Sequence, residues 1–274
     1  MGLRISTNVA SVAAQRQLGR SQARFSHASR ALASGTRLVD PGDDAAGFAI
    51  SENLRGQGES LKAAQRNAES AVGLIQVAEG GLSEQNNILV RLRELAVQAA
   101  SDTVGDEERR FIDIEFQQLG KEFDRIAETT RYGNKMLLTG GNEEYEFQLG
   151  SGGSENDVIR YKMEADTRAA TLGITGLSVE DQDGARSLLT ELDDALMKVA
   201  GARASFGAMQ SRLNIASTNL DVQHENVVSA RSRIADADIA YESAELASAQ
   251  IQQQLGISVL AQANAAPASV MKLL

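Results

Sequence analysis

The residue types most often used in catalysis and metal binding occur in this chain without the spacing that such chemistry needs. The two histidines, His27 and His224, lie far apart in the sequence, and neither has acidic and hydroxyl partners arranged around it in a known motif. His224-Glu225 lacks the second histidine, four residues further on, that a zinc protease uses. The absence of cysteine excludes disulfides, thiol nucleophiles and thiolate metal ligands.

Glycine-rich and acidic segments also lack the pattern of a site. The glycines of residues 150–153 are not followed by a Lys-Ser or Lys-Thr pair at the start of a helix, so we interpret them as a loop and not as a phosphate-binding site. Residues 181–184 resemble part of a calcium loop, but their spacing is wrong. Acid pairs such as Asp43-Asp44 have few aromatic residues to wall a pocket, since aromatics make up 4% of the chain. We therefore expect no catalytic residue, no metal or cofactor site and no enzyme activity.

Long helices are the elements that the sequence predicts most clearly. From Leu54 to Ala99, alternating steps of three and four residues meet apolar side chains at twelve of fourteen positions, and from Phe206 to Leu255 at thirteen of fifteen. Such seams are typical of coiled coils. Because residues 208–255 contain neither Gly nor Pro, we expect one uninterrupted helix there, about 70 Å long. Gly80-Gly81 inside the first seam predicts a bend or a close helix contact.

The remaining elements are shorter. We expect helices over residues 3–34, closed by Gly35, and over 106–130. Alternating apolar residues at 145–149 and 159–163, joined by a Gly/Ser-rich loop, predict a hairpin. The predicted fold class is mainly α, with long paired N- and C-terminal coiled-coil helices, a helical rod domain and a small β-hairpin region at about 141–184.

The charge distribution is uneven along the chain. Residues 1–39 contain six Arg and no acid, whereas residues 141–184 contain ten acids and three basic residues. The formal net charge of −10 argues against nonspecific binding to nucleic acid. The sequence has neither a run of 18 apolar residues nor the apolar stretch of a cleaved signal peptide, so we expect no membrane insertion, and either a cytoplasmic location or export by a route without a cleaved signal.

The two terminal segments are amphipathic and have no obvious partner in the chain except each other. A pair of helices leaves part of its apolar surface uncovered, and neighbouring copies of the chain could cover it. Repetition of one heterologous contact gives an open helical polymer. The apolar positions that we expect to form the polymerisation core are Ile5, Val9, Leu18, Phe25, Leu32, Ile234, Tyr241, Ile251, Leu255 and Leu260.

Several segments match one known family in the same order along the chain. Together they cover roughly residues 1–140 and 185–274, and they resemble bacterial flagellins, in a short form that lacks the large variable outer domains. The matching segments are Ile5-Ser6-Thr7-Asn8-Val9-Ala10-Ser11, Leu32-Ala33-Ser34-Gly35-Thr36-Arg37, Asp43-Asp44-Ala45-Ala46-Gly47-Phe48-Ala49-Ile50-Ser51, Arg91-Leu92-Arg93-Glu94-Leu95-Ala96-Val97-Gln98, Ser232-Arg233-Ile234, Asp236-Ala237-Asp238 and Leu260-Ala261-Gln262-Ala263-Asn264.

This resemblance implies an extracellular subunit of the flagellar filament. Residues 1–39 plus 228–274 would form the inner terminal-helix domain that lines the filament core, and residues 40–227 the helical rod domain. Export would be of type III, without a cleaved signal, and the partners would be other copies of the chain, an export chaperone, the filament cap and the hook-junction proteins. At Asp40-Pro41-Gly42 the chain departs from the family pattern, and Pro41 predicts a turn.

The resemblance also implies recognition by host immune proteins. Arg91, Leu95, Gln98 and Glu115 match positions that family members present to the Toll-like flagellin receptor, although the same surface can serve contacts between subunits. The C-terminal Val270, Leu273 and Leu274 match a tail that a cytosolic immune sensor reads.

Two other functions are compatible with the terminal helices. A hook-filament junction protein shares the terminal plan, but the segment from Arg91 to Gln98 favours a flagellin. A coiled-coil signalling scaffold would form small, closed, fully helical oligomers instead of open-ended polymers.

Because the terminal helices lack cover within one chain, we expect them to be largely unfolded in the monomer and to fold on assembly.

Overall fold

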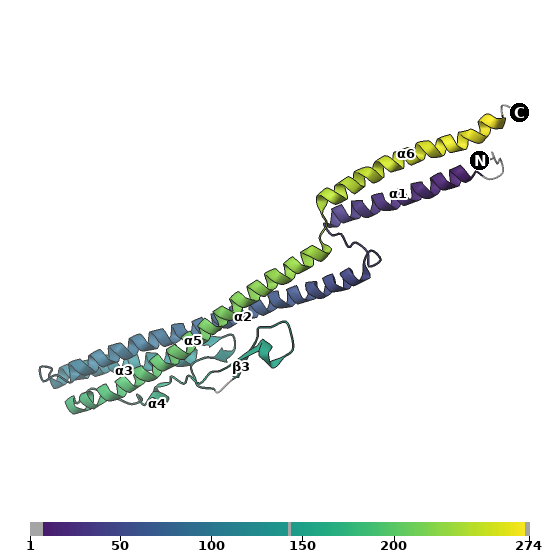
Figure 1. Cartoon of the computed structure of the whole chain (residues 1–274). Helices are drawn as coiled ribbons and strands as arrows, with labels where there is room; N and C mark the ends of the chain where they lie inside the picture. Colours follow the sequence, from purple (N-terminus) through teal and green to yellow (C-terminus); the bar gives the residue numbers. More distant parts are fainter. Residues whose placement is uncertain (1–7, 142–143, 272–274) are drawn as a thin grey trace. The chain divides into compact units, whose positions relative to one another are not determined.

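The fold is mainly α-helical, as the sequence predicts. The computed structural model describes residues 8–141 and 144–271 (Figure 1). The elements in chain order are α1 (Val9–Ser34), α2 (Ala45–Ala99), α3 (Asp106–Thr129), β1 (Arg131–Tyr132), β2 (Lys135–Met136), β3 (Glu144–Gln148), a 3₁₀ turn (Glu155–Asp157), β4 (Val158–Lys162), α4 (Ala169–Leu172), α5 (Gln182–Ala235) and α6 (Ile239–Met271).

The chain divides into two compact units. The terminal unit consists of Met1–Gly58 and Glu225–Leu274, and the central unit of Glu59–His224. Helices α2 and α5 each contribute to both units, because the unit boundaries fall within them. The domain boundaries predicted above, after residue 39 and before residue 228, concern places in a polymer and stay predictions.

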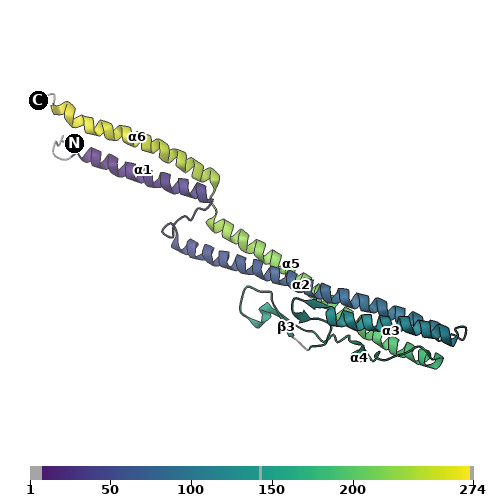
Figure 2. The same cartoon turned by 180° about the vertical axis from the view of Figure 1, so that it is seen from behind.

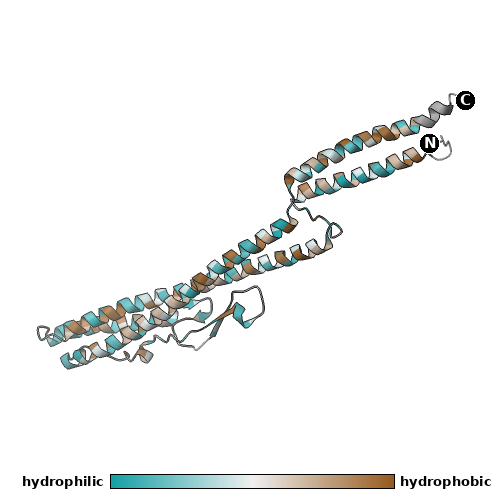
Figure 3. Ribbon diagram, in the orientation of Figure 1, coloured by the Kyte–Doolittle hydropathy of each residue, from teal (hydrophilic) through white to brown (hydrophobic). Residues whose placement is uncertain are grey.

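The core of the central unit follows the first predicted heptad seam. All twelve seam positions from Leu61 to Ala99 on α2 are buried, which confirms this part of the register. Phe123 of α3 and Phe206 of α5 are also fully buried. Coloured by hydropathy, the helices of this unit show apolar residues recurring along their length (Figure 3). Heptad spacing therefore decides which face of α2 enters the core.

Gly81 marks a close contact and not the end of a helix. α2 continues through Gly80-Gly81, and a Cβ added at Gly81 would lie 2.6 Å from Thr130 Oγ1 and 2.9 Å from Leu138 Cδ1. Thr130 and Leu138 flank the small β1–β2 hairpin, which packs against α2 at this point. Of the two outcomes predicted for this pair, the structure shows the close contact.

The long helix predicted over residues 208–255 is interrupted, so that prediction was wrong. α5 ends at Ala235 and α6 begins at Ile239. Asp238 provides the physical reason: its Oδ1 accepts the amides of Ala240 and Tyr241, at 2.9 and 3.2 Å, and so caps α6. The predicted seam beyond Ile234 is not continued, and different residues of α6 face its partner helix.

The middle of the chain forms the hairpin that the alternating pattern predicts. β3 and β4 are antiparallel, with Tyr145 opposite Tyr161 and Phe147 opposite Ile159. The short β1–β2 hairpin was not predicted, because two-residue strands are too short to show an alternating pattern.

A buried arginine closes the end of the central unit where α2 gives way to α3. Arg109 donates from Nε to Ala99 O (2.9 Å), the last carbonyl of α2, and from Nη2 to Ser101 O (3.1 Å) in the turn that follows. Gly105 is the N-cap residue of α3, and the Gly105 amide donates to Glu108 Oε2.

One carboxylate of the central unit has a strongly lowered pKa. Asp166 accepts hydrogen bonds from the Arg168 guanidinium (2.7 and 2.9 Å) and from Thr171 Oγ1 (2.8 Å), and these partners, Arg168 first, lower the pKa of Asp166 to about 2. Because the pKa is lowered in the folded state, Asp166 contributes stability above about pH 4, and the contribution disappears as the pH falls towards 2.

Replacement of Asp166 should therefore have a pH-dependent effect. Asp166→Asn should lower the free energy of unfolding at pH 7 by about 1 kcal/mol, since solvent screens an ion pair this near the surface. The difference from the parent chain should shrink between pH 4 and pH 2. Urea unfolding at several pH values measures it, with the exposed Asp181→Asn as the control. A difference that is constant with pH would contradict the assigned ion pair.

Candidate functional site

The terminal unit contains an antiparallel helix pair formed by the two ends of the chain. α1 and α6 lie side by side in both views (Figures 1 and 2). Asn8 Nδ2 donates to Ala263 O at 2.8 Å, and Gly256 lies close to Leu18. A Cβ at Gly256 would approach Leu18 Cδ1 to 3.3 Å, so the glycine permits the short distance between the helices.

The seam between α1 and α6 is made largely of small side chains. On α1 the buried residues are Ser11, Ala14, Ser21, Ala28 and Ala31. On α6 Ala249 and Glu242 are buried. Small residues let two helices approach closely, but they remove little apolar area from water, so this seam stabilises the pair only weakly.

Large apolar side chains of α6 lie outside that seam. Tyr241 is 67% exposed, and Ile251 and Leu255 are each 58% exposed. Ile239, Ile257 and Val259 are exposed as well, and on α1 so are Val9 and Val12. Large apolar side chains that gather on an exposed surface usually mark a site of contact with other protein chains, so this outer surface is suited to such contact.

The residues predicted for the polymerisation core fall into two groups. Those half-buried in the terminal unit are Leu18, Phe25, Leu32, Ile234 and Leu260, and those exposed are Val9, Tyr241, Ile251 and Leu255. Ile5 lies outside the described residues. Ile257 and Val259 were not predicted; the absence of any charged residue from Leu246 to Met271 was the signal that could have identified them.

A backbone junction joins the segments that precede α2 and α6. Thr36 and Asp236 form an antiparallel bridge, flanked by hydrogen bonds from Arg37 N to Ala235 O (2.7 Å) and from Ala237 N to Gly35 O (3.0 Å). Gly35 adopts φ 69°, a left-handed conformation that ends α1, as predicted. The junction fixes the start of α6 beside the end of α1.

The turn predicted at Asp40-Pro41-Gly42 is present and is held by one carboxylate. Asp43 Oδ2 accepts the amides of Val39 (3.2 Å) and Asp40 (2.9 Å), and His27 Nε2 of α1 lies 3.2 Å from it. The hydrogen bond from the Asp40 amide, with a smaller effect of His27, lowers the pKa of Asp43. The turn is therefore fastened to α1 before α2 begins.

The residues matched to immune recognition occupy one region of α2 and α3. Arg91 Nη2 donates to Glu115 Oε1 at 2.8 Å and Arg91 Nη1 to Glu94 Oε2 at 3.0 Å; all three side chains are about half exposed. The hydrogen bond to Glu115 raises the pKa of Arg91. Gln98 is exposed, but Leu95 is only 1% exposed and packs in the core.

Of the C-terminal residues matched to a cytosolic immune sensor, Leu273 and Leu274 lie outside the described residues, as does the side chain of Val270.

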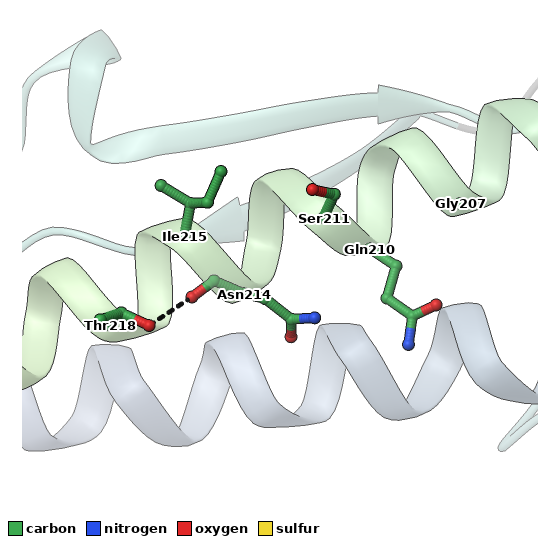
Figure 4. A pocket seen from close by; sticks show the side chains of 6 residues that line it. All are labelled: Gly207, Gln210, Ser211, Asn214, Ile215 and Thr218. Carbon is green, nitrogen blue, oxygen red and sulfur yellow. Dashed lines mark hydrogen bonds between the residues drawn. The ribbon is translucent and has the colours of Figure 1, made fainter.

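Two hollows in the described part have no catalytic arrangement. One, of about 380 Å³, lies along α5 and is lined only by that helix (Figure 4): Gly207, Gln210, Ser211, Asn214, Ile215 and Thr218. The other, of about 360 Å³, lies beside β4 and α5; its acids, Glu164 and Asp166, are engaged with Lys162 and Arg168. Within residues 8–141 and 144–271, no three acidic or histidine side chains gather to hold a metal ion.

None of the described helices combines the length and the apolar content that crossing a membrane would require.

Comparison with known proteins connects these features to one family. The family model of the bacterial flagellin N-terminal helical region matches residues 5–143, and that of the C-terminal helical region matches residues 189–274. A flagellin of Halalkalibacterium halodurans is 37% identical over 271 residues, covering 98% of this chain and 99% of that protein. A flagellar filament 33 kDa core protein of Treponema phagedenis is 36% identical over 290 residues, with the same coverage. The crystal structure of Bacillus cereus flagellin matches with a TM-score of 0.51 at 32% identity, over 57% of this chain and 88% of that one.

Proposed function

Because the chain belongs to the bacterial flagellin family, we propose that it is a structural subunit of the bacterial flagellar filament, in which many copies stack into an open helical polymer. The observation that carries this proposal is the surface of α6, where Tyr241, Ile251 and Leu255 are more than half exposed in the isolated chain. We assign the chain a structural role and no catalytic one.

The terminal helices are the inner part of that polymer. In this assignment residues 1–39 and 228–274 line the filament core, and residues 40–227 form the helical rod domain outside it. The weak seam between α1 and α6 supports folding on assembly, because two helices that share mainly small residues are marginal in water. Neighbouring copies supply the missing apolar contacts, so the terminal helices become stable in the same step in which the chain joins the polymer.

Electron microscopy of the purified chain tests the proposal directly. We expect long filaments of uniform diameter that grow from monomer. A hook-filament junction protein would give no long filaments, and a coiled-coil signalling scaffold would give small closed oligomers. Either of these results would remove the filament assignment.

The wider cellular setting follows the family resemblance. We propose that the chain leaves the cell by type III export without a cleaved signal, as the partner of an export chaperone, and that it joins a filament bounded by the cap and the hook-junction proteins. Its location would then be extracellular, in the flagellum. The uncharged segment from Leu246 to Met271 supports a chaperone on the C-terminal side, since that segment requires cover before assembly.

Immune recognition is a second candidate function, and we propose it for the region around Arg91. The exposed side chains that a Toll-like flagellin receptor would contact are Arg91, Glu115 and Gln98, whereas buried Leu95 supports them from within the core. Val270, Leu273 and Leu274 are proposed for the cytosolic sensor on the resemblance alone.

A reporter-cell assay with Arg91→Ala tests the receptor proposal. We expect the signal from monomer to fall about tenfold or more, because the loss removes the charged group and frees Glu115 and Glu94. Arg93→Ala is the matched control: Arg93 is also exposed on α2, but it pairs with Asp193 of α5, and its loss should leave the signal unchanged. Absence of signal from the parent monomer would end the proposal.

A further inference from the structure

The outer surface of α1 has a row of three arginines. Arg16, Arg20 and Arg24 are spaced four residues apart, which places them in one row along the helix, and all three are exposed. They lie outside the seam with α6, whose α1 positions are Ser11, Ala14, Ser21, Ala28 and Ala31. We call these three residues the arginine row.

The arginine row has no acidic partner in the described part of the chain. α1 contains no acid, and the contacts of Leu18 with Gly256 and of Ser21 with Gln252 place the row beside the uncharged part of α6. The other two arginines of residues 8–39 do have partners: Arg30 is paired with Asp40 at 2.8 Å, and Arg37 donates to Ile234 O. Like charges four residues apart destabilise a helix, so in a single chain the arginine row disfavours the fold of α1.

In a polymer, repulsion among the arginine rows of neighbouring copies adds to the repulsion within each row. Each added copy brings three more positive charges, and in a polymer these repel one another unless carboxylates lie among them. The chain itself supplies such groups: residues 59–224 contain 28 acidic and 17 basic residues. Exposed carboxylates there that lack an ion pair within the described residues include Glu59, Glu69 and Asp221.

We propose that the arginine row docks against carboxylates of the central unit of a second copy of this chain. The inference rests on the proposed function and identifies a polar component of the same assembly. Apolar burial of α6 supplies the affinity of the contact between copies, and the arginine row sets its register, because opposite charges must meet and like charges must not.

The critical concentration for polymerisation, measured by sedimentation, tests the proposal. R16Q/R20Q/R24Q should raise it about tenfold at about 50 mM NaCl, as expected for the loss of three exposed ion pairs. At about 1 M NaCl, where the screening length falls to about 3 Å, the ratio to the parent chain should approach one. R16K/R20K/R24K keeps the charges and should assemble nearly as the parent does.

A matched control removes three exposed charges that are already paired within the chain. Arg110, Arg125 and Arg160 pair with Glu107, Glu122 and Glu146, so R110Q/R125Q/R160Q changes the net charge equally but should leave the critical concentration unchanged. An unchanged value for the R16Q/R20Q/R24Q variant, or an increase that is the same at both salt concentrations, would overturn the proposal.

An anionic membrane is the competing partner for a basic helix face. Binding of the parent monomer to phosphatidylglycerol vesicles, lost in R16Q/R20Q/R24Q while assembly stays normal, would likewise overturn the proposal. If the parent chain forms no polymer at all, the proposed function fails, and that result is distinct from each of these.

Discussion

A chain that carries Ile251→Asp and Leu255→Asp should remain monomeric at concentrations at which the parent chain forms filaments. Both side chains are 58% exposed on α6, so the isolated chain gains little from them. We expect both to become buried in the proposed filament, and burial of one such side chain is worth about 1.5–3 kcal/mol. Together they should raise the critical concentration more than about 100-fold, measured by sedimentation and electron microscopy.

The same variant should leave the folded central unit unchanged. Its thermal unfolding midpoint should match that of the parent monomer, because neither residue belongs to residues 59–224. Met197→Asp is the matched control: Met197 is a 75% exposed apolar residue on α5 of the central unit, and its replacement should permit filaments. Normal assembly of the Ile251→Asp, Leu255→Asp chain would show that α6 is not an assembly surface.

Replacement of Phe123 should lower the stability of the central unit, which the two replacements on α6 should leave unchanged. Phe123 is fully buried on α3, and Phe123→Ala should lower the free energy of unfolding of the central unit by about 3–5 kcal/mol, because it removes a buried ring and leaves a cavity. Denaturant unfolding of the monomer measures this loss. Phe111→Ala, on the same helix but at a site that is 68% exposed, should change stability by less than about 0.5 kcal/mol.

The two experiments separate stability from assembly. A loss of stability on Phe123→Ala that equals the loss on Phe111→Ala would contradict the core described for the central unit. If both sets of results are as expected, folding of residues 59–224 and polymerisation through α6 depend on different residues of one chain.

Sequence periodicity predicted the parts of the fold in which one helix face is buried along its whole length. From Leu61 to Ala99 the seam has only one register that places apolar residues in the core, so counting residues was enough. The break after Ala235 could not be found in this way. It depends on the cap supplied by Asp238 and on the backbone bridge between Thr36 and Asp236, which joins segments about 200 residues apart.

The same limit applies to the candidate site. Apolar spacing identified Ile251 and Leu255, but it could not show which residues of α6 face α1, and in the structure these include Ala249 and Gly256. Because the apolar side chains of α6 are spread over several faces of the helix, its sequence favours no single face, and only the fold shows which side is left uncovered. Motif matching selected both Leu95 and Arg91, but a motif does not show which side chain is buried. In the structure Leu95 lies in the core and Arg91 on the surface.

Amide hydrogen exchange of α1 and α6, compared between monomer and filament, tests most directly whether copies supply the cover that one chain lacks. We expect these amides to exchange rapidly in the monomer and to become strongly protected in the filament, while those of α3 are protected in both. Equal protection of α1 and α6 in the monomer and in the filament would contradict the account.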